Sequence, residues 1–196
     1  MLKKMKSWKK QLMKLFHRIK KKEKLNKKQR KLIFILKFLI RFSLLAIPLY
    51  LIMYFGNLFL LKVVETKQIS ILLNLTEIKN SVEINDEVIL NVEPLKNKLV
   101  IDDACTGYRS MLAFAALVLA VPKIRNSKKS VALILGIPAI YVINILRIFS
   151  TILIAVKFGE EKLEFVHTFL WREGLIFLIL ILWLLWLNNV KEEISF

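Results

Sequence analysis

The chain has 196 residues, of which 56% are hydrophobic, and its formal net charge is +17. This apolar content exceeds what a soluble domain needs, and it gathers in stretches near the length of a bilayer-spanning helix. The positive charge is concentrated at one end, which argues against the uniformly basic surface of a nucleic-acid-binding protein. A single cysteine excludes an intramolecular disulfide.

The positive charge lies almost entirely at the N-terminus. Residues 1–31 contain thirteen Lys, two Arg and one Glu, a net charge of +14. Within 5–24, apolar residues recur every three or four positions opposite a Lys-rich face. This spacing predicts an amphipathic helix on the anionic inner leaflet. We therefore predict a basic cytoplasmic segment, 1–31, followed by a membrane domain, 32–196.

The first spanning segment is predicted at about 32–61. Lys37 and Arg41 lie near its start, and the side chains of both can extend towards the basic side of the membrane. Phe42–Leu61 is an uncharged run of twenty residues. At ~1.5 Å per residue it covers about 30 Å, the thickness of the hydrocarbon core.

Residues 62–103 differ in character, since they carry five Lys and eight Asp or Glu. Val82–Ile84 and Val88–Val92 flank the turn residues Asn85-Asp86-Glu87, a pattern typical of two strands and a hairpin. Lys98–Ile101 is a third strand candidate. We predict a small β-rich cap that depends on packing against the helices for its stability.

Three further spans are predicted at about 104–122, 131–156 and 169–187. The first of these ends at Pro122, and the basic loop 123–130 follows it. The sequence therefore predicts an all-α membrane protein. It would be a four-helix polytopic bundle with a small extracytoplasmic β-rich cap and a basic amphipathic N-terminal helix.

The distribution of Lys and Arg predicts the orientation of the chain in the plasma membrane. The N-terminus and the 123–130 loop are the two basic flanks without compensating acids, and four spans place them on the same side. Both are then cytoplasmic, because short cytoplasmic loops carry the excess of Lys and Arg. The cap and the 157–168 loop are then predicted to lie outside.

This topology predicts that three reactive side chains meet at the outer side. Cys105 begins the second span, and His167 precedes the fourth. Arg147 lies sixteen residues into the third span, about 24 Å from its inner end. An arginine within a spanning helix is costly, so it normally faces a polar interior and indicates function.

The three residue types suit nucleophilic catalysis. A thiolate is a strong nucleophile, and a neighbouring Arg or His lowers the pKa of the thiol. Histidine can take the thiol proton and return it to a leaving amine, while arginine can stabilise an oxyanion. Asp102 and Asp103 would oppose ionisation of the thiol.

Other functions are compatible with the same residues. One is a non-catalytic membrane assembly or scaffold protein, for example in polysaccharide export, whose basic tail binds lipid or a partner. Another is a metal site formed by Cys105, His167 and Asp102 or Asp103, although paired ligand spacing such as C-x-x-C is absent. A lipid-modified cysteine is not favoured, because a polar segment precedes Cys105.

Three segments resemble motifs of the exosortase/archaeosortase family. Asp103–Arg109 (DACTGYR) resembles its A-C-[ST]-G nucleophile signature, and Pro138–Ile148 (PAIYVINILRI) resembles its second motif. Val166-His167-Thr168-Phe169 resembles the third. The similarity covers about 85–187. Many members have about eight spans, so this chain resembles a short form.

The resemblance implies a membrane cysteine protease-like transpeptidase without a cofactor. Such enzymes are thought to recognise exported proteins that end in a short motif, a spanning helix and a basic cluster. By position, Cys105 would be the nucleophile, His167 the acid/base and Arg147 the group that stabilises the reacting centre. Arg109 and Asn144 would be supporting residues.

Overall fold

The computed structural model describes residues 26–55, 58–93, 95–161 and 174–194, with the side chains of 52–55 and 194 excepted. Most of the predicted N-terminal amphipathic segment, and His167, lie outside the described residues. The chain divides into two compact units, 1–37 and 38–195. The second unit contains the sheet, the cysteine and most of the described helices.

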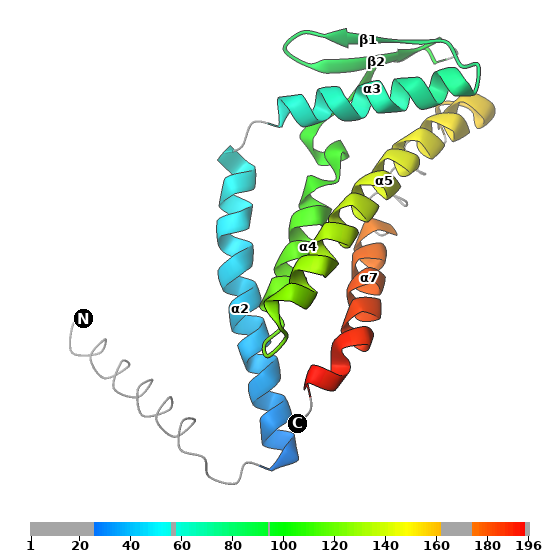
Figure 1. The fold of residues 1–196 in the computed structure, drawn as a ribbon. Helices are drawn as coiled ribbons and strands as arrows, with labels where there is room; N and C mark the ends of the chain where they lie inside the picture. The colour runs from blue at the N-terminus through cyan, green and yellow to red at the C-terminus, as the bar shows by residue number, and fades with distance from the viewer. Residues whose placement is uncertain (1–25, 56–57, 94, 162–173, 195–196) are drawn as a thin grey trace, which may run out of the picture. The chain divides into compact units, whose positions relative to one another are not determined.

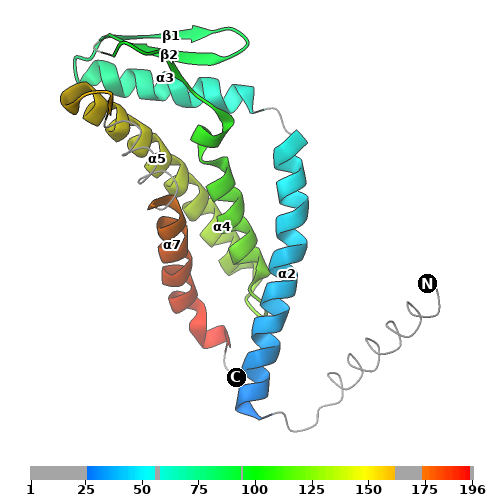
Figure 2. The ribbon, with the colours of Figure 1, turned by 180° about the vertical axis from the view of Figure 1, so that it is seen from behind.

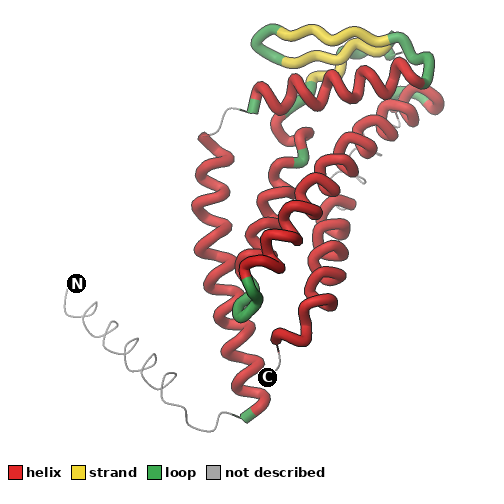
Figure 3. Tube along the Cα trace, in the orientation of Figure 1, coloured by secondary structure: helices red, strands yellow, loops and turns green. Residues whose placement is uncertain are grey.

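Among the described residues, three helices are long and apolar enough to cross a membrane. They are α2 (Lys27–Phe55), α5 (Asn126–Phe158) and α7 (Leu175–Val190), which continues into the short helix η3 (Lys191–Ile194). Helices α5 and α7 lie where the sequence predicts spans at 131–156 and 169–187. The prediction of a mainly helical membrane protein is therefore confirmed (Figures 1 and 3).

The predicted count of four spans is not confirmed. Helix α4 (Tyr108–Ala120) has only 13 residues, about 20 Å of helix, which is short of the hydrocarbon thickness. The start of the predicted span forms a separate 3₁₀ turn, η1 (Asp103–Thr106), and Gly107 follows in a left-handed conformation. At the other end Val121 is extended, as expected for the residue before Pro122.

The first predicted span is wrong at its C-terminal end. Helix α2 ends at Phe55, and a second helix, α3 (Phe59–Leu75), begins four residues later. The predicted span, 32–61, and the predicted cap, 62–103, therefore both overlap α3. Lys62, Glu65 and Lys67 interrupt the apolar run, and the helix buries one stripe instead of being apolar all round.

The three predicted strands are present after α3. They are β1 (Asn80–Ile84), β2 (Val88–Val92) and β3 (Leu99–Val100), which form an antiparallel sheet in that order. Ile84 pairs with Val88 across the hairpin turn. Along β2, Val88, Leu90 and Val92 are buried, so one face of the sheet is covered. The stretch predicted as a β-rich cap thus contains a helix as well as a sheet.

Helix α3 connects the sheet to the rest of the unit. It packs against β1 and β2 on one side and against α5 and η1 on the other (Figures 1 and 2). The core between them contains Ile69 and Leu73 of α3, Leu90 and Val92 of β2, and Ile145, Ile148 and Ile152 of α5. This packing fixes α3 beside the part of α5 that contains the predicted second motif.

A second core joins α4, α5 and α7. It is centred on Phe114 of α4, Ile140 of α5 and Ile179 of α7. Gly136 of α5 allows a close approach, because a Cβ there would collide with the ring of Phe114. Helices α4 and α5 are therefore tightly packed, which fixes the turn at the start of α4 against α5.

Candidate active site

Cys105 lies on a tight turn that precedes helix α4. The side chain of Asp102 caps η1 by accepting a hydrogen bond from the Asp103 amide at 2.6 Å. The Cys105 amide donates to the Asp102 carbonyl at 2.8 Å, and the Thr106 hydroxyl donates to the Asp103 carbonyl at 2.9 Å. The turn thus satisfies several of its own polar groups and holds a half-buried cysteine.

Two side chains of α5 contact this turn at one atom. The Asn144 amide nitrogen Nδ2 donates to the Cys105 carbonyl oxygen at 2.9 Å, and Arg147 Nη2 donates to the same oxygen at 3.4 Å. Residues three apart lie on the same face of a helix, so both side chains point to the turn. The structure therefore brings together Cys105, Asn144 and Arg147, three of the five residues proposed from the sequence.

Gly107 makes this approach possible. Its φ is +66°, a left-handed conformation that side chains rarely adopt, and a Cβ there would lie 2.7 Å from Asn144 Cγ. The presence of glycine at the end of the A-C-T-G segment thus has a structural explanation. Only glycine both turns the chain into α4 and leaves room for the Asn144 amide.

Replacing Gly107 with alanine is expected to lower the thermal unfolding midpoint of the detergent-solubilised chain. The left-handed conformation costs roughly 1–2 kcal/mol with a side chain, and the collision with Asn144 adds to it. Gly159→Ala is the matched control, because Gly159 also has a positive φ, +95°, but no atom of the described residues lies within 4 Å of its would-be Cβ. Equal losses in the two variants would contradict the contact between Gly107 and Asn144.

Glu65 is a site residue that the sequence analysis missed. It lies on α3, its side chain is 0% exposed, and neither carboxyl oxygen has a hydrogen-bond partner among the described residues. Burial raises the pKa of Glu65 to about 8, and the positive charge of Arg147 offsets part of that rise. Two features of the sequence point to Glu65. It is a lone acid directly after the largely apolar run 58–64, and its spacing of four residues from Ile69 and of eight from Leu73 places it on their face of the helix.

The buried carboxyl predicts a pH-dependent stability. The folded state holds the Glu65 proton more tightly than the unfolded chain does. The stability that the protonated carboxyl contributes is therefore complete below pH 4.5 and is lost as pH rises through about 8. The unfolding midpoint of the wild type should fall over this window. In Glu65→Gln the part of this fall that comes from Glu65 should be absent. Glu87→Gln, which removes a carboxylate from the exposed hairpin turn, should behave as the wild type. Parallel curves for all three proteins would contradict burial of an ionisable carboxyl.

The surroundings of Cys105 raise the pKa of its thiol above the usual value. Burial is the main cause that raises its pKa, and the charges of Asp102 and Glu65 act in the same direction. A hydrogen bond from the Asp102 backbone to the thiol and the charge of Arg147 oppose this rise. Asp103 pairs with Lys62 at 2.9 Å.

Two of the five proposed residues are not placed at the turn. His167 lies outside the described residues. Arg109 is exposed on the first turn of α4, where its Nε donates to the Tyr108 hydroxyl at 3.4 Å. Arg109 borders a groove of about 430 Å³ that residues of α2, including Ala46 and Tyr50, line from the other side.

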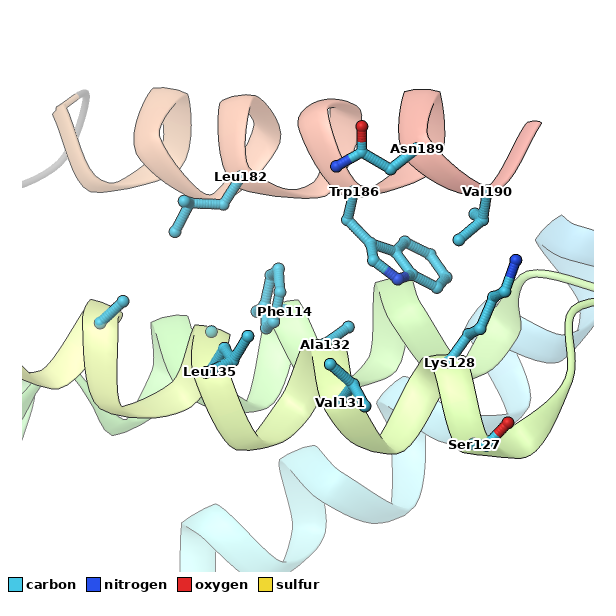
Figure 4. A pocket seen from close by; sticks show the side chains of 12 residues that line it. Phe114, Ser127, Lys128, Val131, Ala132, Leu135, Leu182, Trp186, Asn189 and Val190 are labelled. Atoms are coloured by element: carbon cyan, nitrogen blue, oxygen red, sulfur yellow. The ribbon is translucent and has the colours of Figure 1, made fainter. Parts of the chain in front are cut away.

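A larger cavity lies away from the cysteine. It has a volume of about 640 Å³ between the first half of α5 and the second half of α7 (Figure 4). Leu182 and Trp186 of α7, Phe114 of α4 and Leu135 of α5 line it, with Lys128 at one end. The four proposed site residues that the structure describes all lie outside its lining.

Comparison with protein families identifies a matching family model. A family model described as transmembrane exosortase matches residues 28–187, a range that includes η1, α4 and α5. Comparisons with curated proteins and with solved structures give no match.

Proposed function

Because the chain belongs to the transmembrane exosortase family, we propose that it is a membrane cysteine transpeptidase that cleaves the C-terminal sorting signals of exported proteins. Cys105 is the nucleophile, Arg147 stabilises the reacting centre and His167 is the acid and base. Asn144 positions the cysteine turn, and Arg109 supports the site from the adjacent helical turn.

The observation that carries this proposal is the contact between the cysteine turn and α5. Asn144 and Arg147, which lie 39 and 42 positions further along the chain, both donate to the Cys105 carbonyl oxygen. This contact holds the Arg147 guanidinium beside the nucleophile. The positive charge of Arg147 acts directly on the thiol. A fixed cation next to a thiol is positioned to stabilise negative charge on the sulfur and on a carbonyl oxygen that it attacks.

These roles define a complete reaction. The thiol proton passes to His167, the sulfur bonds to the scissile carbonyl carbon, and Arg147 pairs with the oxyanion that forms. The C–N bond then breaks, and His167 returns the proton to the leaving amine. The substrate acyl group remains on Cys105 as a thioester. An acceptor amine or water attacks the thioester and regenerates the thiol.

The proposed membrane placement rests on the charge pattern. The basic N-terminus binds the cytoplasmic leaflet, and the cap with the Cys105 turn lies on the opposite side. A substrate with its own spanning helix would then present its cleavage motif at the outer end of that helix. The apolar surfaces that α2, α5 and α7 leave exposed suit a lipid environment.

A trapping experiment tests the nucleophile. The full chain is co-expressed with an exported substrate that ends in a short motif, a spanning helix and a basic cluster, and membranes are treated with hydroxylamine. We expect a substrate hydroxamate at the cleavage position, because hydroxylamine cleaves thioesters, and no hydroxamate with Cys105→Ala. Hydroxamate formation in the alanine variant would refute the role of Cys105.

A further inference from the structure

Three ionisable side chains from three elements meet at the candidate site. Glu65 comes from α3, Cys105 from η1 and Arg147 from α5, and each of the three interacts electrostatically with the other two. Helix α3, which carries this buried carboxyl, packs against both η1 and α5. A carboxylate and a thiolate would then share the charge of one guanidinium.

Several polar and charged side chains of α3, η1 and α5, the elements that pack together here, have partners of their own. Lys62, one turn earlier on α3, pairs with Asp103 of η1 at 2.9 Å. The Tyr141 hydroxyl of α5 donates to Gln68 Oε1 of α3 at 2.7 Å. Asp102 accepts the hydrogen bond from the Asp103 amide that caps η1. Among the described residues, Arg147 is therefore the cation that acts on both Glu65 and Cys105.

We propose that Glu65 is a positioning residue that competes with the Cys105 thiolate for the positive charge of Arg147 and so sets the pH at which the thiol ionises. The inference rests on the proposed function for its importance to catalysis, but the acidity of the thiol can be measured without turnover. While Glu65 is protonated, it carries no charge and does not compete for the positive charge of Arg147. Once Glu65 ionises, it attracts Arg147 and repels the thiolate, so the second proton is held more tightly.

Burial explains why this competition is strong. Neither carboxyl oxygen of Glu65 is exposed at the surface or in contact with a donor among the described residues, so its charge is poorly screened. An exposed carboxylate at the same separation would have a much smaller effect. The same burial keeps the carboxyl protonated over the neutral range, so the competition begins only in alkaline conditions.

The test is the pH dependence of Cys105 alkylation in the detergent-solubilised full chain, with iodoacetamide from pH 6 to 10. Cys105 is the single cysteine, so the signal has one source. At pH 9 we expect Glu65→Gln to react about three to ten times faster than the wild type, whereas below pH 7 the two should coincide. Glu65→Asp should retain the wild-type profile, and Glu87→Gln is the matched control for the loss of one exposed carboxylate.

The shape of the curves separates this role from a structural one. A variant that merely loosens the turn would react faster by the same factor at every pH, and that result would overturn the proposal. So would identical profiles for Glu65→Gln and the wild type. If Glu65→Gln does not fold, the pH dependence of the alkylation rate in the wild type tests the proposal by itself. Two coupled acids broaden this titration, so a curve that fits a single proton would overturn the inference. A chain that shows this coupling but processes no substrate would refute the proposed function alone.

Discussion

Replacing Cys105 with alanine is expected to abolish processing of a co-expressed tailed substrate. The thiol sulfur is the atom that carries the acyl group in the proposed reaction, so the loss should be at least about 10³-fold. Processing is measured as the loss of a tag placed after the basic cluster. Cys105→Ser should also be severely impaired, because an alcohol is far harder to deprotonate than a thiol.

The matched measurement is the unfolding midpoint of each variant. The turn around Cys105 is held by backbone groups, namely the Cys105 amide and the Cys105 carbonyl, and neither is altered by the substitution. Alanine at this position should therefore leave the fold intact. Undiminished processing by a folded Cys105→Ala chain would refute the enzyme and leave the scaffold hypothesis.

Arg147→Gln is expected to lower the processing rate by about 10² to 10³-fold. The guanidinium is proposed to meet charge that develops on the sulfur and on the substrate oxygen, and removal of one such donor typically costs that much. Because the effect belongs to the transition state, the maximal rate should fall more than the apparent affinity for substrate. The measurement is a time course over a range of substrate levels.

The control for Arg147 is a cation on the same helix that lies away from the turn. Lys157 is exposed in the last turn of α5, and Lys157→Gln removes the same charge. It should process substrate at the wild-type rate. If Arg147→Gln lost only affinity, or if both variants lost rate equally, Arg147 would not act at the reacting centre.

The sequence predicted the parts of the site that depend on local pattern. The motif residues Cys105, Asn144 and Arg147 were selected from the sequence, and the structure places all three at one carbonyl oxygen. The hairpin was predicted from the apolar runs of β1 and β2 on either side of its turn residues. The hairpin depends on residue spacing along neighbouring strands, whereas Asn144 was proposed from the resemblance of Pro138–Ile148 to the family's second motif.

Features that depend on tertiary packing were not predictable in the same way. Glu65 was grouped with the cap, because a charged residue in a polar stretch indicates exposure until α5 and β2 are known to cover its face. The short helix α4 was predicted too long because residues 104–107 are small and uncharged. Their 3₁₀ turn is held by the Asp102 cap and by Asn144 from a distant helix.

The orientation of the chain and the part played by His167 stay predictions from the sequence. The orientation rests on the charge pattern, and the role of His167 rests on the resemblance of Val166–Phe169 to the family's third motif.

The most direct test of one shared centre is labelling of intact cells with a membrane-impermeant maleimide. In the wild type we expect Cys105 to be labelled from outside, and in a Cys105→Ala, His167→Cys variant we expect the same for residue 167. Accessibility of both positions from outside is what a thiol and an imidazole in one external site require. Labelling of one position only after the cells are opened would place the two on opposite faces and contradict a common active centre.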